Sequence, residues 1–567
     1  MAHEVSAGPL PAHGRSKARA RAVPFLGSIL LGATVTVWLL WFVCRGPLTF
    51  DDAYMFHRYG THVLSGLGVV WNEGGAPTYG LTSQLWLFVL LPLFTLPLSA
   101  ATALQLASWL GGGMAIAVMG RAVAREAQSP PLSNQAAAMG AVGLPLLLHP
   151  AFAAQLMTGM DTMLSLLLNA AVMLAAMRYA KVPSTGTAIV SGLVSFAAVL
   201  TRPENGICAL GVPLLVFAAQ APTKRWRDFV YLFVLPLLLL MAALALAQFY
   251  YGSALPLSFY AKSAHGYDGF LNPESAVRYL AVALSCAVPF IAALVIGMRH
   301  GIRPPMLVLA MPAGLTVCYL LTVRQIMGWD GRFFIPFLPY VVIPGLLSLD
   351  AMLARGVNWS DLGRPLARGI AGGFAALLGV LALQTGIVRL NLAALAPQAV
   401  AAPRLDHRAA APLPEKSWFA VVQQIGDRIV SRLPAGAVVA ASEIGYIGSV
   451  APHVAIVDLV GLNDTHIGRS GLSMDYLLGF KPDIIWFPHG DYTGLRSKML
   501  SDPRLYERYV VIAGAFNYGL AIRRDSPHRA SIESDVAAAW AQLYPDRSMP
   551  DYVVTRAGEA RVGRGST

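Results

Sequence analysis

Two adjacent carboxylates, Asp51 and Asp52, open a polar stretch directly after the first long apolar segment of the chain. Carboxylates this close raise one another's pKa, which is the condition for a general base that works near neutral pH. The competing interpretation is a solvated stop after a membrane helix, and it is the commoner one for an arbitrary carboxylate pair. Here the position of the pair, at the lip of a membrane segment, favours catalysis.

Residues 49–86 surround this pair with side chains that a plain connection between two helices does not need. His57 and Arg58 follow within seven residues of the pair. Rings that suit a membrane–water interface occur at Tyr54, Tyr59, Trp71 and Tyr79. We therefore predict that this loop forms a catalytic surface on the outer face of a membrane.

Cationic side chains fall in several stretches that we predict for the same face: Arg58, Arg202, Lys262, His265 and Arg332. Several cations facing one carboxylate pair suit a substrate with phosphate, because Arg binds phosphate oxygens bidentately and neutralises a departing phosphate. The alternative is that these side chains snorkel towards lipid headgroups. For Lys262 and Arg332 the two interpretations are about equally probable. It is weaker for Arg202, because Pro203 breaks the helix beside it.

The other polar candidates each have a structural alternative. Asp161 and Glu204 could cap helices, Asp330 could form a turn in GWDG, and Tyr260 could belong to an interfacial aromatic belt. The candidate substrate-binding residues are His57, Tyr79, Asp161, Glu204, Tyr260, His265 and Asp330. We expect no cofactor and no metal ligands, although a divalent metal is left open.

Composition places these residues in a polytopic α-helical membrane protein. The chain has 567 residues, of which 56% are hydrophobic and 13% charged, and its mean hydropathy is +0.56. The net charge of +12 fits basic cytoplasmic loops facing anionic lipid, so we expect membrane lipids and no nucleic acid as partners. The four cysteines lie in apolar segments without metal-ligand spacing.

The charge pattern decides how many of the apolar runs cross the membrane. Twelve runs are candidates, and the run at 85–98 is short and contains Pro92 and Pro97. If it does not cross, five basic clusters fall on the cytoplasmic side: Arg121/Arg125, Arg178/Lys181, Lys224/Arg225/Arg227, Arg299/Arg303 and Arg355/Arg364/Arg368. We therefore predict about eleven transmembrane helices plus a re-entrant or interfacial helix, with a cytoplasmic N-terminus.

The C-terminal third has the pattern of a soluble domain. Residues 417–433 have the periodicity of an amphipathic helix, and five β-type runs follow, at 437–442, 454–461, 483–487, 509–514 and 518–524. This alternation predicts a small extracytoplasmic α/β domain. The predicted parts are a basic N-terminus (1–22), a transmembrane domain (23–390) with its first outer loop (45–100), a linker (391–414), the α/β domain (415–526) and a polar tail (527–567).

Motifs spread over most of the chain resemble the GT-C class of integral-membrane glycosyltransferases. The strings are closest to the arabinofuranosyltransferase B type, the terminal β-(1→2) arabinofuranosyltransferases: FDDAYMFHRYG, GVVWNEGG, YGLTSQLW, GMDTML, LTRPEN, YYGSALPLSFYAK, GRFFIPFLP and DLVGLND. Relatives usually have a Gly-Glu or similar pair where this chain has GMD, so no role is carried over to Asp161.

The resemblance implies an inverting transfer, without a covalent enzyme intermediate, of a sugar from a polyprenyl-phosphate donor. The acceptor would be a hydroxyl of a cell-envelope glycan or glycolipid, outside a bacterial inner membrane. Asp51 or Asp52 would be the base, with Asp51 narrowly preferred, and Arg58, Arg202, Lys262 and Arg332 would lie near the donor phosphate. The outer C-terminal domain would help to hold the acceptor.

Three alternatives remain open. A GT-C transferase could instead move a hexose or aminoarabinose onto lipid A, a teichoic acid, another glycolipid or a protein. A lipid transporter would need ionisable groups deep in its helices, whereas these charges gather at one face. A non-enzymatic glycan-assembly protein would not need the Asp pair. The sequence contains no GxxxxGK[ST], HExxH, CxxC or GxSxG motif, which disfavours an ATP-driven pump, a zinc protease and an α/β-hydrolase.

Overall fold

A computed structural model gives the fold. It describes residues 13–44, 46–220, 226–263, 276–302, 304–322, 328–355, 418–489, 492–512 and 514–547, with 549, 554–555 and 559–560. Several predicted features lie outside these residues: His265, the apolar run at 369–390 and the linker at 391–414.

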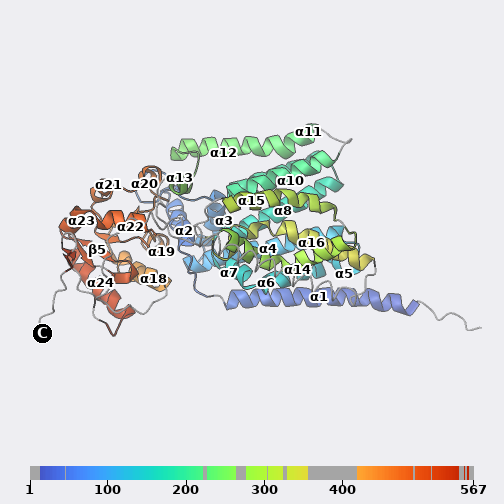
Figure 1. Cartoon of the computed structure of the whole chain (residues 1–567), viewed down its shortest axis with the longest axis horizontal. Helices are drawn as coiled ribbons and strands as arrows, with labels where there is room; N and C mark the ends of the chain where they lie inside the picture. Colours follow the sequence, from blue (N-terminus) through green and yellow to red (C-terminus); the bar gives the residue numbers. More distant parts are fainter. Residues whose placement is uncertain are drawn as a thin grey trace, which may run out of the picture.

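A bundle of apolar helices forms the larger part of the molecule (Figure 1). Its principal helices are α1 (His13–Val43), α4 (Ala100–Glu126), α6 (Gln135–Leu147), α7 (Pro150–Met157), α8 (Thr162–Lys181), α9 (Thr185–Thr201), α10 (Gly206–Ala219), α12 (Leu235–Tyr251), α14 (Ala276–Arg299), α15 (Met311–Thr322) and α16 (Pro339–Ala354). Side-chain oxygens cap some of them: Ser99 accepts a hydrogen bond from the Thr102 backbone, and Ser184 forms a capping box with Thr187.

Within the described residues, four helices are long and apolar enough to cross a membrane, or six if two bent pairs each count as one span. The bends are 91° between α6 and α7 and 61° before α16. Five further apolar helices are shorter, and among them is α3 (Gln84–Phe94). Its 11 residues span about 17 Å, less than a hydrocarbon layer of about 30 Å. This length supports the expectation that residues 85–98 do not cross; the count of eleven crossings stays a prediction.

The basic helix ends meet at the end of the bundle away from the C-terminal domain (Figure 1). Lys181, at the end of α8, contacts Glu126 at 2.9 Å and the carbonyl of Arg125 at 3.1 Å. Tyr179 donates a hydrogen bond to Asp228 of α11 (Trp226–Phe229) at 3.1 Å. These contacts place the ends of α4, α8 and α11 together, as expected if they share one membrane face. That this face is cytoplasmic remains a prediction.

The first outer loop lies at the opposite end and is itself ordered. Its first helix, α2 (Asp51–Leu64), is followed by a turn closed by a bridge between Val70 and Pro77, and then by α3. The short helix α13 (Leu257–Ser263) packs against this loop, because the Leu257 backbone donates a hydrogen bond to the Tyr79 carbonyl at 2.8 Å.

The C-terminal domain is built on a five-stranded mixed sheet of order β2-β1-β3-β5-β4. The strands are β1 (Val438–Ala441), β2 (Ala455–Asp458), β3 (Ile484–Trp486), β4 (Tyr509–Ile512) and β5 (Leu520–Arg523). β1 pairs in parallel with β2 and β3, and β5 pairs antiparallel with β3 and β4. The five strands occupy the five β-type runs of the sequence. A separate antiparallel pair, β6 (Val554–Thr555) and β7 (Glu559–Ala560), follows the domain.

Helices cover this sheet: α18 (Trp418–Arg428), α19 (Gly445–Val450), α20 (Thr465–Ser470), α21 (Met474–Gly479), α22 (Thr493–Leu500), α23 (Pro503–Arg508) and α24 (Arg529–Leu543). Val536 and Trp540 of α24 are buried in the core of the domain. The predicted boundary at residue 526 is therefore too early, because an apolar face of α24 completes this core.

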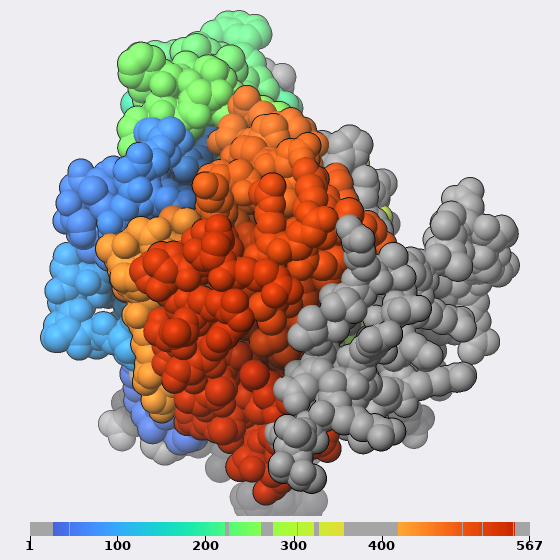
Figure 2. All heavy atoms as spheres, turned by 90° about the vertical axis from the view of Figure 1, so that its left-hand side faces the viewer, coloured from blue at the N-terminus to red at the C-terminus, as the bar shows by residue number. Residues whose placement is uncertain are grey.

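One hydrophobic core continues from the first outer loop into the C-terminal domain. Tyr59, Trp71 and Trp86 of the loop belong to the same buried cluster as Ile447 and Trp486 of the domain. Viewed end-on, the domain (orange to red) lies against the first outer loop (blue) (Figure 2). The loop is thus an adaptor that fixes the domain on the helical bundle.

Candidate active site

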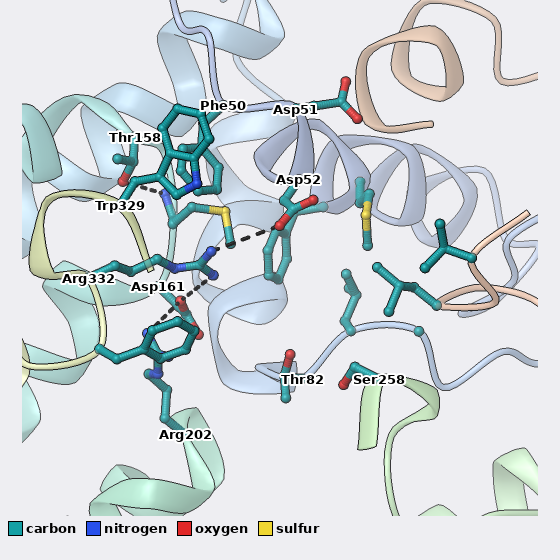
Figure 3. Close-up of a pocket in the computed structure, with 18 of the residues that line it drawn as sticks. Phe50, Asp51, Asp52, Thr82, Thr158, Asp161, Arg202, Ser258, Trp329 and Arg332 are labelled. Carbon is teal, nitrogen blue, oxygen red and sulfur yellow. Dashed lines mark hydrogen bonds and ion pairs between the residues drawn. The ribbon is translucent and has the colours of Figure 1, made fainter. Parts of the chain in front are cut away.

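A cavity of about 1100 Å³ lies where the first outer loop, the ends of the bundle helices and the C-terminal domain meet. The sequence-predicted residues that line it are Asp51, Asp52, Asp161, Arg202, Glu204, Asp330 and Arg332. The segments that carry them lie as much as 281 positions apart in the chain, between Asp51 and Arg332. The fold therefore brings together the Asp pair and two of the predicted phosphate-binding arginines (Figure 3).

The two carboxylates of the Asp pair point in different directions. Because α2 begins at Asp51, the successive side chains of Asp51 and Asp52 diverge by about 100° around the helix axis. Asp51 is 3% exposed and turns away from the cavity centre (Figure 3). Asp52 keeps 29% of its side chain exposed and faces Arg332, with Oδ2 3.9 Å from Nη1.

Asp51 attaches the first outer loop to the C-terminal domain. Its carboxylate accepts hydrogen bonds from the backbone N–H groups of Gly445 at 2.7 Å and Tyr446 at 2.8 Å, at the start of α19. Burial raises the pKa of Asp51 to about 6, against the lowering effect of these hydrogen bonds. The geometry opposes our narrow preference for Asp51 as the base, because both of its oxygens are already bound to the domain.

Asp161 lies between the two arginines. Its Oδ1 is 3.6 Å from Arg202 Nη1 and 3.7 Å from Arg332 Nη2. Arg202 also binds Glu204, with Nε and Nη2 at 2.8 Å and 2.7 Å from Oε1. The guanidinium groups of both arginines lie over the ring of Phe333, at 4.8 Å and 5.6 Å.

The local backbone positions the two arginines. Arg202 ends α9 in an extended conformation, since Pro203 cannot continue the helix. The next turn is held by Asn205, which donates to Ser165 Oγ and the Ala198 carbonyl, both at 2.9 Å. Gly331, at φ +75°, brings the segment before Arg332 close to α14; a Cβ there would lie 3.1 Å from α14 backbone atoms.

Hydrogen-bonding capacity remains unused in this cluster. Among the described residues, Asp161 Oδ1, Arg202 Nη1 and Arg332 Nε are buried without a hydrogen-bond partner. The Asp161 contacts of 3.6 and 3.7 Å are longer than a hydrogen bond. Unpaired buried polar groups are costly, so their concentration here marks a place where a polar ligand would bind.

Arg58 and His57 lie in the interface between the loop and the domain and do not line the cavity. Arg58 is fully buried and donates to the carbonyls of Trp71, Gly448, Ala451 and Val454 and to Asn72 Oδ1, at 2.6–3.0 Å. His57 Nδ1 is 2.8 Å from Ser449 Oγ, and burial lowers the pKa of this imidazole to about 4. This geometry opposes the predicted phosphate role of Arg58, because its donors already bind four backbone carbonyls and the Asn72 side chain.

The remaining predicted residues divide between the cavity rim and other places. Tyr79 stacks on Tyr251 with ring centroids 4.6 Å apart, and Tyr260 lies under Arg469; neither lines the cavity. Asp330 lines the rim at φ +52°. Lys262 belongs to α13, but the structure does not describe its side chain, and His265 lies outside the described residues.

Glu443 is a cavity residue that the sequence analysis missed. It follows β1 and is 8% exposed. The available signal was its place just beyond the carboxyl end of a buried parallel strand, where ligands commonly bind in α/β sheets.

Within the part of the chain that the structure describes, no group of three or more His, Cys, Asp and Glu side chains is placed to hold a metal ion. The charged groups that meet at the cavity centre are instead opposite in sign, with arginines facing carboxylates.

The fold is similar to that of ArnT from Cupriavidus metallidurans, a GT-C glycosyltransferase whose crystal structure was solved in the apo state. The two share 14% sequence identity with a TM-score of 0.50, and the match covers 87% of this chain and 97% of that one. Residues 415–544 match a family described as a domain of unknown function, DUF8728. No curated protein sequence matches the chain. The chain therefore has a GT-C-like fold of a multi-pass helical membrane protein, and the narrower resemblance to the arabinofuranosyltransferase B type remains a prediction.

Proposed function

We propose that this protein is an inverting glycosyltransferase that moves a sugar from a polyprenyl-phosphate donor to a hydroxyl of an envelope glycan or glycolipid. The observation that carries the proposal is the pairing in one cavity of Asp52 with Arg332 and Arg202, whose donors are incompletely used. A base and a cationic phosphate site are the two groups that such a transfer needs.

In the proposed reaction, the Asp52 carboxylate accepts the proton of the acceptor hydroxyl. The hydroxyl oxygen forms the new bond to the anomeric carbon of the donor sugar from the side opposite the phosphate. The bond between that carbon and the phosphate oxygen breaks, and its electron pair leaves with the polyprenyl phosphate. Arg332 and Arg202 stabilise the charge that develops on the departing phosphate.

The apolar part of the cavity supports a lipid-borne donor. Among its lining residues are Ile207 of α10 and Leu320 of α15, together with Leu255 and Pro256 just before α13 and Phe259 within it. Ile207 and Leu320 lie on helices of the bundle, so in this proposal the prenyl chain follows these apolar helices while its phosphate reaches the arginines. This arrangement also places the reaction at the membrane surface, which we propose to be the outer face of a bacterial inner membrane.

The sugar is assigned from sequence strings, and the fold alone does not choose it. Arabinofuranose follows from the resemblance to the arabinofuranosyltransferase B type. The likeness to ArnT fits the aminoarabinose alternative at least as well. A divalent metal is not part of the proposed step.

The test is turnover by the purified full-length protein in detergent, with polyprenyl-phosphate arabinofuranose, hexose and aminoarabinose donors compared side by side. We expect transfer from the arabinofuranose donor that persists in excess chelator. Transfer from aminoarabinose alone would select the alternative reaction. A second measurement follows lipid translocation with the protein reconstituted in vesicles. Translocation without sugar transfer from any donor would contradict the glycosyltransferase proposal and support the transporter alternative.

A further inference from the structure

The end of the cavity formed by the C-terminal domain carries a carboxyl group that the proposed reaction does not use. Glu443 lines the cavity together with Asp52 of α2 and with Trp418 and Phe419 of α18. Its Oε1 accepts a hydrogen bond from Ser442 Oγ at 3.3 Å, and Ser442 Oγ accepts one from the His489 backbone at 3.1 Å. Among the described residues, Ser442 is its one hydrogen-bond partner.

The position of Glu443 relative to Asp52 is fixed through Asp51. Asp51 holds the backbone of Gly445 and Tyr446, two and three residues beyond Glu443. Gly445 has no room for a side chain, because a Cβ there would lie 1.9 Å from the Asp51 carbonyl oxygen. The turn that carries Glu443 is thus locked to the first turn of α2, which carries Asp52.

The surroundings of Glu443 oppose its ionisation. Burial raises the pKa of Glu443 well above its usual value, and the nearby carboxylates of Asp51 and Asp52 raise it further. In the described residues, no arginine or lysine is within ion-pair distance of its carboxyl. A neutral carboxyl group can donate one hydrogen bond and accept another, which an ionised group cannot do.

We propose that Glu443, in its neutral form, binds two hydroxyls of the acceptor sugar and so presents a third hydroxyl to Asp52. This assignment rests on the proposed function and adds to it a specific acceptor-binding residue from the C-terminal domain. Each sugar hydroxyl can both donate and accept, so a neutral carboxyl group can donate to one hydroxyl of the sugar and accept from another. Trp418 lies at the same end, and its buried indole Nε1 has no hydrogen-bond partner among the described residues.

The experiment compares three variants of the full-length protein with a polyprenyl-phosphate arabinofuranose donor and a synthetic arabinofuranosyl disaccharide acceptor. Glu443→Ala should raise the acceptor KM by about fivefold or more, since a lost hydrogen-bond pair leaves sugar hydroxyls unpaired. Glu443→Gln keeps a neutral donor and acceptor and should stay within about threefold of wild type. Glu507→Ala, at an exposed position of α23, is the matched control and should leave both KM values unchanged.

The outcomes separate this inference from the proposed function. An unchanged acceptor KM in folded Glu443→Ala, with an active wild type, overturns the role of Glu443 alone. If kcat falls as much in Glu443→Gln as in Glu443→Ala, an ionised Glu443 is needed. That result also overturns the inference. An inactive wild type with every donor removes the proposed function itself.

Discussion

Two arginine-containing regions lie on different sides of α2, and they use their charges in opposite ways. In the interface with the C-terminal domain, Arg58 donates hydrogen bonds to four backbone carbonyls and one side-chain oxygen. In the cavity, Arg332 faces Asp52 and Asp161 at 3.9 Å and 3.7 Å, and its Nε has no hydrogen-bond partner among the described residues. Both guanidinium groups are almost fully buried.

The difference shows that saturation of hydrogen bonds, and not burial, separates the structural arginine from the candidate functional ones. A buried polar group with all its partners stabilises one arrangement, whereas an incompletely paired one is retained where a ligand completes it. The same contrast divides the Asp pair, since Asp51 is bound to the domain and Asp52 faces the cavity. Substitutions on the two sides should therefore fail in different ways.

The largest difference is expected between Asp52→Asn and Asp51→Asn. Asp52→Asn removes proton acceptance while keeping size, so kcat should fall about 10²–10⁴-fold with an unchanged unfolding midpoint. Asp51→Asn places an amide N–H₂ against the backbone N–H of Gly445 or Tyr446, so it should mainly lower stability. Turnover and thermal unfolding of both purified variants test the contrast. A larger kcat loss in folded Asp51→Asn would reverse the two assignments.

Arg58→Ala should give the next largest effect, on stability. It removes a donor from four carbonyls, of which that of Ala451 keeps a hydrogen bond from the Val454 backbone, and this should cost on the order of 3 kcal/mol in unfolding free energy. Arg58→Lys should recover little of this loss, because a single ammonium group cannot reach all the carbonyls that the planar guanidinium group of Arg58 binds. Denaturant unfolding in detergent measures both variants. Normal stability combined with a raised donor KM would return Arg58 to the phosphate site.

Arg332→Ala and Arg202→Ala should act on the donor instead. The loss of a charge-assisted contact to phosphate costs about 1.5–3 kcal/mol, so the donor kcat/KM should fall roughly 10- to 100-fold. The acceptor KM should change by less than about threefold, because neither residue is assigned to the acceptor. Steady-state kinetics with each substrate varied in turn provides the measurement. Equal losses for donor and acceptor would mean that the arginines hold the cavity together rather than bind phosphate.

The sequence predicted the parts of this site that depend on local pattern. The Asp pair after an apolar segment, the Pro after Arg202 and the five β-type runs each have a local signature. The roles of Arg58 and His57 could not be predicted, because their partners Gly448 and Ser449 lie about 390 positions further along the chain. The place of Glu443 in the site also depends on a distant contact, because the packing of α19 against α2 brings Glu443 into the same cavity as Asp52.

The smallest effect concerns the pH dependence of the interface itself. His57 has its pKa lowered from 6.5 to about 4 by burial, so the unfolded state binds more protons and stability falls as the pH drops below 6.5. Asp51 has its pKa raised from 3.8 to about 6, so the folded state binds more protons and stability rises as the pH drops through 6. Between pH 7 and 5 the two changes are about 2 kcal/mol lost and about 1 kcal/mol gained, so the opposing contributions leave a net loss of only about 1 kcal/mol.

Single substitutions should separate these two opposing contributions. Relative to wild type at each pH, His57→Asn should become more stable on going from pH 7 to pH 5, because the buried imidazole no longer resists protonation. Asp51→Asn should become less stable over the same interval, because the favourable protonation of Asp51 is lost. Denaturant unfolding of the three proteins at pH 5, 6 and 7 gives the two slopes. Slopes of the same sign would show that burial does not shift the pKa values of His57 and Asp51 in opposite directions in this interface.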